Sequence, residues 1–539
     1  MKIAGFHSNH DAAYAILENG RPVIHAELER YIRLKEPMGD VFDLMMEDLP
    51  ESEWADIKHF AHVFEPPSKR HFGLAYKESI NKVYDLVERN EGQFHCPGHH
   101  QSHAANAFFS SNFNDALIIT VDGGGFDVVA ADKECVPGTF TAWRGDNLDI
   151  APIMYLRDST TVENSLNIGM MWSLCTEQIF GLSRGYPKGN QCGSVMAMAC
   201  MGDPSKHFDL FYNNRFCGAK NFPWDKLRGL AKESEQNCFD IAAALQKATE
   251  TVFKEIVDNI LEHTTSRNLC LAGGVILNSV MTGKILTEWY GDRFDNVYVC
   301  PVPYDAGLAI GSAQWVWHSV LRNPRIKWDD NFTPYLGHTY SEEVILNALN
   351  SEKNVKFKKS NVDELINLLD EGMIVSVFSK GSESGRRALG NRSILADPRR
   401  KEMKDLINEK VKHRQWYRPF APSILRERVK DWFETDHQSP YMSFVFKIKE
   451  DKRKEIPAVV HFDGSARLQT VTENDNEWYY SFLKKWERKS GVPVILNTSF
   501  NDREPIVETP EDAIKCFLGT DIDFLYFVDC GLMVEKNNI

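Results

Sequence analysis

Hydrophobic positions near the start of the chain fall into three short runs separated by polar breaks. KIAGF, AAYAIL and PVIHAEL are typical of strands, and Asn19-Gly20 is a residue pair preferred in two-residue hairpin turns. From residue 116 onward, ALIITVD, GGGFDVVAA and GTFTAWR repeat the order of strand, loop, strand, turn and strand. The pattern predicts two copies of one meander in the N-terminal half of the chain.

Apolar residues recur every three or four positions around the two meanders, which is the spacing of an amphipathic helix. Helices are predicted over 78–90, 99–110 and 239–264, and LCLAGGVILNSVMTGKI is typical of a buried strand, a Gly-Gly turn and a helix. Duplicated meanders of this kind occur in the two-lobed, phosphate-handling folds of actin, sugar kinases and chaperone ATPases. We therefore predict an α/β protein with a duplicated N-terminal domain of this type, with two unrelated meanders as the alternative.

A break in periodicity divides the chain. Between residues 322 and 340 the helical and strand patterns stop, and Pro, Asp, Asn and Gly collect as in a linker. The chain then resumes with a predicted helix near 362–371 and the strand MIVSVF. Because 539 residues exceed what one hydrophobic core usually serves, we expect two domains, 1–334 and 335–539.

Charge and composition exclude several classes of protein. A formal net charge of -14 disfavours a broad electrostatic grip on duplex nucleic acid. No apolar run approaches the roughly 20 residues that span a bilayer, and MKIAGFHSNH is too polar for a signal peptide. The 11 cysteines include no CxxC pair, which fits reduced thiols. We expect a cytoplasmic protein with no membrane partner.

A group of four histidines lies in HCPGHHQSHAANAF, residues 95–108. On a helix, His99 and His103 project from one face, so both imidazoles can reach one metal ion. Asp122 and Asp305 each follow an apolar, strand-like run and precede glycine, which places them at the ligand-binding edge of an α/β sheet. Two imidazoles and two carboxylates suit a divalent transition ion such as iron or zinc. The alternative is that the histidines are surface or capping residues.

Two glycine-rich turns could bring backbone N–H groups close to an anion, one in VDGGGFD and one in AGGVILN. Together they favour a nucleotide or acyl-phosphate site, with Gly123, Gly124, Gly273, Gly274 and Asn278 as the candidate residues. In the second half, arginines recur in ESGRRALGNRSILADPRR, VKHRQWYRPFAPSI and HFDGSARLQTV. They are embedded among turn and strand residues, which favours a polyanion pocket over a solvated basic face.

These segments carry a resemblance to a known family. Nine segments resemble the O-carbamoyltransferases of nodulation factors and antibiotic tailoring. They are NHDAA, GHHQSHAANAF, LAGGVILN, YDAGLAIG, GRRALGNRSILADPR, RPFAPS, HFDGSARLQTV, LNTSFN and EPIV. The resemblance covers nearly the whole chain. It implies an actin-like (ASKHA-type) N-terminal domain with a metal site, and a C-terminal α/β domain similar to threonylcarbamoyl-adenylate synthase.

The resemblance also implies a reaction. Carbamoyl phosphate and ATP, the latter with Mg²⁺, would form carbamoyl-adenylate in the C-terminal domain, and an iron site in the N-terminal domain would direct the carbamoyl group onto an acceptor hydroxyl. Cationic side chains would align the two polyanions. The expected residues there are Arg387, Lys412, Arg418 and Arg467, with Asn497 and Ser499 as neutral donors. His10 matches the family's HDA motif as the candidate base, and Lys35 matches a family lysine that could hold phosphate.

The chain departs from the family pattern at three places. CGSVMAMA at 192–199 replaces EGKxMGLA, NDREPIV replaces GEPIV after NTSFN, and SGRRALG replaces FGPRALG. These changes leave the acceptor open between a small molecule and a hydroxymethylated pyrimidine nucleotide or nucleic acid. A catalytically silent, nucleotide-dependent scaffold is an alternative of another class, opposed by the retained arginines, histidines and aspartates. Zinc or manganese would suit the same ligands as iron, and a homodimer is one option for the assembly.

Overall fold

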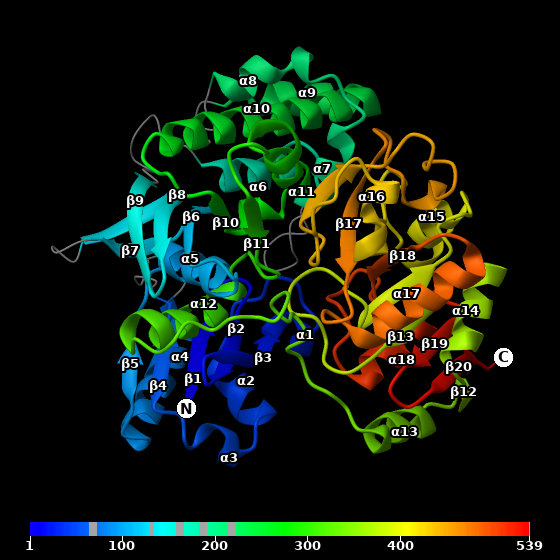
Figure 1. The fold of residues 1–539 in the computed structure, drawn as a ribbon, viewed down its shortest axis with the longest axis horizontal. Coiled ribbons are helices and arrows are strands. Elements are labelled where there is room, and N and C mark those ends of the chain that lie inside the picture. Colours follow the sequence, from blue (N-terminus) through cyan, green and yellow to red (C-terminus); the bar gives the residue numbers. More distant parts are fainter. Residues whose placement is uncertain (64–72, 130–133, 158–166, 183–190, 214–221, 538–539) are drawn as a thin grey trace. The chain divides into compact units, whose positions relative to one another are not determined.

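A computed structural model describes residues 1–63, 73–129, 134–157, 167–182, 191–213 and 222–537. The chain divides into two compact units, Met1–Trp328 and Asp329–Ile539. No helix or strand lies between Val320 and Glu342, a stretch that the structure describes in full. Each unit has its own sheets and is described separately (Figure 1).

The first sheet of the N-terminal unit has the strand order β3-β2-β1-β4-β5. β1 is antiparallel to β2 and parallel to β4, β2 is antiparallel to β3, and β4 is parallel to β5. Asn19 and Gly20 both have positive φ, as the predicted hairpin turn between β2 and β3 requires. The strands are β1 Lys2–His7, β2 Ala13–Glu18, β3 Arg21–Glu27, β4 His59–His62 and β5 Gln93–His95.

The second sheet repeats this arrangement. β8 is antiparallel to both β6 and β9 over the same residues, so these two strands lie on its opposite edges. β6 is in turn parallel to β10, and β10 to β11. The order β9-β8-β6-β10-β11 matches the first sheet strand for strand, which confirms the duplicated α/β fold. The strands are β6 Asp115–Val121, β8 Glu134–Asp146, β9 Asp149–Arg157, β10 Asn268–Ala272 and β11 Asn296–Val299.

The prediction of the second meander was wrong in one respect. GGGFDVVAA contributes β7, Phe126–Val129, which pairs only with the first residues of β8 and adds a hairpin that the first copy lacks. GTFTAWR lies within β8, the second strand of the copy, and the third strand is β9. At 13 residues, β8 is long enough to pair with β7 along one part and with β6 and β9 along the rest. Apolar and polar residues that alternate with a period of two predict a strand, but they do not predict which strands pair with it.

The helices that follow the last strand of each copy pack against each other. α5, His99–Phe109, follows β5, and α12, Gly307–Trp315, follows β11. The two backbones approach closely at Gly311, where an added Cβ would lie 2.0 Å from the carbonyl oxygen of Ser102. The predicted helices over 78–90 and 239–264 are confirmed as parts of α4 and α10. The other helices of this unit are α1 Leu28–Ile32, α2 Val41–Asp48, α3 Glu51–Trp54, α4 Gly73–Arg89, α6 Ile168–Gln178, α7 Cys192–Ala199, α8 Phe208–Tyr212, α9 Trp224–Glu233, α10 Glu235–Leu261 and α11 Ser279–Lys284.

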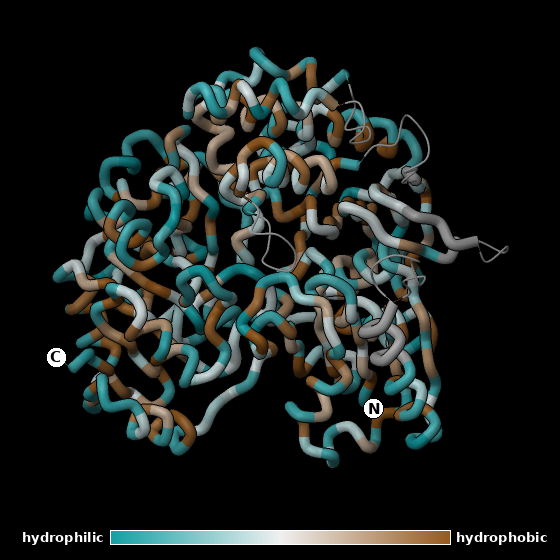
Figure 2. Tube along the Cα trace, turned by 180° about the vertical axis from the view of Figure 1, so that it is seen from behind, coloured by the Kyte–Doolittle hydropathy of each residue, from teal (hydrophilic) through white to brown (hydrophobic). Residues whose placement is uncertain are grey.

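Hydrophobic burial follows the two copies. One cluster joins the first sheet to α2 and α4 through Phe6, Tyr14 and Phe60, and another joins α5 to the second sheet through Phe108 and Trp143. Figure 2 shows hydrophobic and hydrophilic segments alternating along the chain. Within the described residues, no helix combines the length and apolar character needed to cross a bilayer.

The C-terminal unit is built on one nine-stranded sheet, ordered β12-β20-β19-β13-β14-β18-β15-β17-β16. The predicted helix at 362–371 is α14, and MIVSVF contains β13. The strands are β12 Val355–Lys359, β13 Val375–Phe378, β14 Arg392–Ala396, β15 Ala421–Leu425, β16 Phe444–Lys447, β17 Ser465–Val471, β18 Val494–Ser499, β19 Phe524–Phe527 and β20 Leu532–Lys536. The helices are α13 Glu342–Ser351, α14 Val362–Glu371, α15 Met403–Leu406, α16 Val429–Trp432, α17 Glu477–Ser490 and α18 Pro510–Leu518.

Candidate functional site

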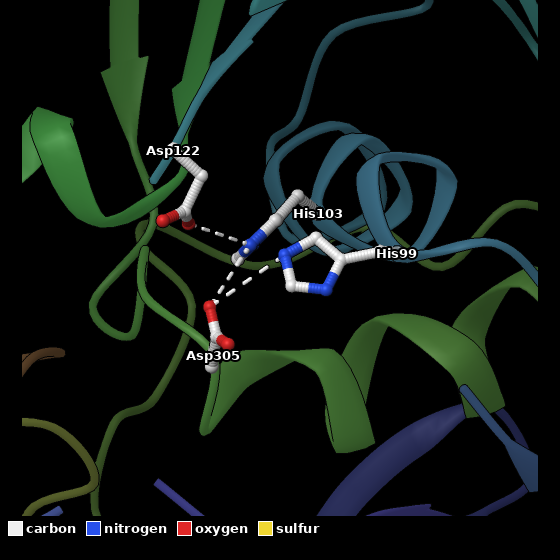
Figure 3. A group of neighbouring side chains, drawn as sticks. All are labelled: His99, His103, Asp122 and Asp305. Carbon is white, nitrogen blue, oxygen red and sulfur yellow. Dashed lines mark ion pairs between the residues drawn. The ribbon is translucent and has the colours of Figure 1, made fainter. Parts of the chain in front are cut away.

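The structure brings together the four residues that the sequence proposed as metal ligands. His99 and His103 project from the first turns of α5, Asp122 follows β6, and Asp305 precedes α12 (Figure 3). One ligand atom from each of the four lies within 4.8 Å of the others, and all four residues are buried. Two copies of the meander therefore supply one cluster, with imidazoles from the first copy and carboxylates from the second.

The distances within the cluster leave room for an ion. Nε2 of His103 lies 3.1 Å from Oδ2 of Asp122 and 3.5 Å from Oδ1 of Asp305, and Nε2 of His99 lies 3.7 Å from the same Asp305 oxygen. Nε2 of His103 is buried but forms no hydrogen bond of acceptable angle. A buried polar atom without a hydrogen bond is costly unless another partner occupies the space. The donor set of two imidazoles and two carboxylates fits a divalent transition ion.

Opposite charges within the cluster outweigh the effect of burial. Burial raises the pKa of Asp305, but His10, His99 and His103 together hold this pKa well below its usual range. Burial lowers the pKa of His103, but the carboxylates of Asp122 and Asp305 raise it above its ordinary value. The aspartates are therefore ionised, as metal binding requires.

Two further histidines lie at the cluster: His7, the last residue of β1, and His10, in the loop that follows. Nε2 of His10 is 3.2 Å from Oδ2 of Asp305, and its Nδ1 is 3.1 Å from Oδ2 of Asp11. His7 is fully buried and donates from Nε2 to the carbonyl of His10 at 3.1 Å, and burial lowers its pKa to about 3. Sequence reasoning proposed His10 but missed His7 and Asp11. The alternation of β1 turns the His7 side chain into the cluster, which only the register reveals.

The remaining histidines of the motif are structural. Nε2 of the buried His100 donates to the carbonyl of Gly138 at 2.9 Å, and its Nδ1 lies 2.9 Å from the Thr120 hydroxyl. His95 pairs with His59 at 3.1 Å between neighbouring strands. Neither points to a ligand role.

The glycine turns hold Asp122. The N–H of Gly123 donates to Oδ1 of Asp122 at 2.5 Å, and the N–H of Gly274 donates to Oδ2 at 2.8 Å. These two amides therefore orient a carboxylate here, and open space remains beside Gly124. Gly273 lies too close to the backbone of β6 for any side chain, since an added Cβ would meet the Val121 oxygen at 2.1 Å.

Asn278 and Lys35 lie on other elements. The Asn278 side chain caps α11 by accepting from the N–H of Met281 at 3.2 Å, and it donates to Gln246 at 2.8 Å. Lys35 is half-buried in the loop after α1. Their proposed phosphate contacts stay predictions.

Two residues outside the cluster hold its elements in place. Asp127 in β7 accepts from the backbone N–H groups of Gln101 at 2.9 Å and His100 at 3.3 Å, so it caps the N-terminus of α5. Nε2 of His25 in β3 donates to the carbonyl of Ala306, next to Asp305, at 2.9 Å. The hydrogen bonds of Asp127 join β7 to α5, and the sequence positions of these two elements did not predict that they are in contact.

In the C-terminal unit, the predicted polyanion-binding residues gather at one edge of the sheet. The edge is defined by pairing: β15 and β17 are parallel, and β18 runs antiparallel to β15 with Ala421 opposite Asn497. The same edge therefore carries four of the predicted residues. They are Arg418 just before β15, Arg467 near the start of β17, and Asn497 and Ser499 toward the end of β18. The loop that carries Arg387 enters β14, which pairs Ser393 with Ser499 there.

Several arginines come close together at this edge. Burial and the charges of Arg387 and Arg418 lower the pKa of Arg467 well below its usual range. Burial and the charges of Arg418 and Arg467 do the same to Arg414, a residue that we had not proposed. Nε of Arg467 is buried and makes no hydrogen bond within the described residues. Buried guanidinium groups of like charge at one end of the sheet favour an anionic ligand.

Lys412 and Asn497 are held by neighbouring polar groups. Nζ of Lys412 donates to Oδ1 of Asn501 at 2.6 Å and to the Ser499 hydroxyl at 3.2 Å. Asn497 donates its amide to Gln469 at 2.9 Å and to Ser423 at 3.1 Å, while its Oδ1 is buried without a hydrogen bond. The amide N–H groups of Asn497 are therefore engaged within the protein, and its proposed contact with a ligand stays a prediction.

Glu383 shapes the loop that carries Arg387. Its fully buried carboxylate accepts from the backbone N–H groups of Leu389 and Asn391 at 2.7 Å and of Arg392 at 3.1 Å. A buried carboxylate bonded to three amides fixes a loop strongly. Sequence analysis missed Glu383, the first residue of ESGRRALGNRSILADPRR, because a single acid at the start of an arginine-rich segment resembles an ordinary surface residue.

Comparison with known proteins agrees with this two-part arrangement. The family model described as carbamoyltransferase N-terminus matches residues 69–314, and the one described as carbamoyltransferase C-terminus matches residues 366–534. Nodulation protein NolO of Bradyrhizobium diazoefficiens is 35% identical over 451 residues, which are 79% of this chain and 77% of that protein. The chain belongs to the carbamoyltransferase family. It is therefore a transferase enzyme.

Further matches extend over much of the chain. The uncharacterized protein sll1178 of Synechocystis is 34% identical over 510 residues, which are 85% of this chain and 79% of that protein. Among solved structures, HypF of T. kodakarensis matches 60% of this chain and 47% of its own at 14% identity, with a TM-score of 0.34. The fold assignment rests on the repeated strand order.

The departures from the carbamoyltransferase motifs lie on distinct elements. CGSVMAMA is α7, with Cys192 half-buried at its start. In NDREPIV, Asp502 pairs with His413 at 3.2 Å, next to the Lys412 that Asn501 holds. The second departure therefore lies beside the proposed anion site, and it adds an ion pair to the turn that carries Lys412.

Proposed function

We propose that the protein is an ATP-dependent O-carbamoyltransferase with one reaction site in each unit. The observation that carries this proposal is the convergence of Arg387, Arg414, Arg418 and Arg467 at one sheet edge. Like charges held this closely destabilise the protein unless an anion binds between them. Carbamoyl phosphate and ATP are polyanions of the required kind, and the family membership points to the first of them.

The C-terminal unit would form carbamoyl-adenylate. Water converts carbamoyl phosphate into carbamate and phosphate; a carbamate oxygen then attacks the α-phosphorus of Mg-ATP, and pyrophosphate leaves. The arginines and Lys412 offset the charge that gathers between the two substrates. Oδ1 of Asn497 suits the carbamoyl NH₂ group, which can only donate.

The N-terminal unit would transfer the carbamoyl group. Burial lowers the pKa of His10, but the carboxylates of Asp305 and Asp11 raise it to about 10. A cation held by Asp305 would offset those charges, so that His10 could accept the proton of an acceptor hydroxyl, whose oxygen attacks the carbamoyl carbon while AMP leaves. His99, His103, Asp122 and Asp305 would hold a divalent ion, Fe²⁺ by analogy with the family, and the ion would polarise the carbamoyl oxygen. Lys35 is the candidate for holding the adenylate phosphate, and the acceptor is a hydroxyl-bearing small molecule.

Pyrophosphate release tests the proposal. The wild-type protein should release pyrophosphate only when ATP and carbamoyl phosphate are both present. Arg418→Ala should lower that rate by roughly 100-fold and leave the bound metal unchanged. His103→Ala should do the opposite, retaining pyrophosphate release without transfer. Equal loss of pyrophosphate release in both variants would contradict two separate sites.

A further inference from the structure

Two aromatic side chains stand half-exposed beside the arginine cluster. Trp416 is 49% exposed and Phe462 is 52% exposed. Their ring centroids lie 5.6 Å apart with an interplanar angle of 85°, so one ring meets the other edge to face. Nζ of Lys404 lies 4.3 Å from the centroid of the Phe462 ring. Two large rings and a cation thus form one exposed platform.

Trp416 is fixed relative to the arginines by one buried side chain. Nδ2 of Asn408 donates to the carbonyl of Arg418 at 3.0 Å and to the carbonyl of Trp416 at 3.4 Å. Oδ1 of Asn408 accepts from Nε of Arg414 at 2.8 Å. A single amide therefore sets the conformation of the turn that presents Trp416 between two arginines of the cluster.

Phe462 is fixed by a second turn at the same edge. The N–H of Gly464 donates to the carbonyl of His461 at 2.9 Å, and the N–H of His461 donates to the carbonyl of Ser465 at 2.8 Å. This turn leads directly into β17, which carries Arg467. Because β15 and β17 are parallel, the turns before them lie at the same end of the sheet, so the segments that carry the two rings are the ones that carry Arg418 and lead to Arg467.

We propose that Trp416 and Phe462 form the base-binding platform for the nucleotide whose phosphates occupy the arginine cluster. The inference rests on the proposed function, and it adds the residues that recognise the nucleoside end of ATP. A purine joined to a polyphosphate has a flat apolar part and a polyanionic part, matching a ring platform beside arginines. Aromatic side chains that stack on bases are used widely because every base has a π face.

The test compares ATP with inorganic tripolyphosphate, which has the charge but no base. Calorimetric binding of each is measured without carbamoyl phosphate, so the result does not depend on turnover. Trp416→Ala should weaken ATP binding by roughly tenfold or more and change tripolyphosphate binding less than about twofold. Trp416→Phe should recover most of the ATP affinity. Phe462→Ala should act as Trp416→Ala does.

Two controls separate this inference from the proposed function. Arg418→Ala should weaken the binding of both ATP and tripolyphosphate. Its loss of ATP binding identifies the measured binding as binding at the arginine cluster. Tyr84→Ala removes another half-exposed ring in the N-terminal unit, whose centroid lies 4.5 Å from that of Phe94, and should change neither affinity. Equal ATP affinity in Trp416→Ala and wild type would overturn the platform, and the rings would then serve another contact. Absence of pyrophosphate release by the wild type would instead overturn the proposed function, whatever the binding result.

Discussion

Nε2 of His103 lies 3.1 Å from Oδ2 of Asp122, although one residue belongs to the helix that ends the first meander and the other follows the first strand of the second. The contact joins the two copies where both direct polar side chains into one buried cluster. The histidine motif therefore depends on a carboxylate from the second sheet.

Neighbouring histidines of the motif should differ in what they support. His103→Ala should leave the fold intact and remove the bound metal, because the ion pairs of its imidazole are with the cluster carboxylates Asp122 and Asp305. His100→Ala should lower the free energy of unfolding by about 1–3 kcal/mol, because it leaves buried partners at Thr120 and Gly138 unsatisfied. Elemental analysis and thermal melting of both variants check this. Full metal content in His103→Ala would refute the assignment.

Removing the cap of α5 should weaken the cluster from a distance. Asp127→Ala leaves two N-terminal amides of α5 without their acceptor, which should cost about 1 kcal/mol of stability. The first turns of α5 carry both imidazole ligands, so metal affinity should fall as well. Competitive titration with a chelator measures that affinity. Asp127→Asn keeps an acceptor oxygen and should lie between wild type and Asp127→Ala; unchanged affinity in both would separate the cap from the metal.

Glu383 should act on ligand binding without touching a ligand. Glu383→Ala removes the acceptor of three backbone amides, so the loop that carries Arg387 should lose its conformation. We expect a loss of at least about 2 kcal/mol in stability and a rise in the KM for carbamoyl phosphate. Glu383→Gln, which keeps one acceptor oxygen, should recover part of both. If stability falls while the KM holds, the loop does not position the site.

Arg467 should limit the stability of the free protein. Burial and two neighbouring guanidinium groups lower its pKa, so its charge is held at a cost. Arg467→Met should therefore raise the melting temperature of the ligand-free protein by a few degrees and abolish the increase that ATP and carbamoyl phosphate cause. Thermal melting with and without both substrates is the measurement. A less stable variant that still responds to substrates would make Arg467 a structural residue.

Local patterns predicted the elements that depend on neighbouring residues. The turn at Asn19-Gly20, α14 and the pairing of His99 with His103 on one helix face each follow from spacing alone. The strand-end positions of Asp122 and Asp305 also followed from short segments. Their convergence with the histidines was predicted because strand-end aspartates lie at the ligand-binding edge of an α/β sheet, where the two imidazoles needed further ligands.

Features that depend on register and long-range pairing could not be predicted. β9 was missed because a period of two does not say which strand is the neighbour of β8. His7 was missed because its direction depends on the register of β1, and Asp127 because its partners lie on α5. Glu383 and Arg414 act through loop contacts that no spacing marks.

Matching strand orders give the metal cluster one further property. The loop after β1 corresponds to the loop after β6, and the β5–α5 connection corresponds to that between β11 and α12, so each copy contributes two of the four candidate ligands. A motion that separated the copies would open the shell. By linkage, any ligand that favours such an opening must weaken the ion's affinity by the same factor by which the ion weakens that ligand's binding. An acceptor that favoured such an opening would therefore lower metal retention, and bound metal would lower the acceptor's affinity equally.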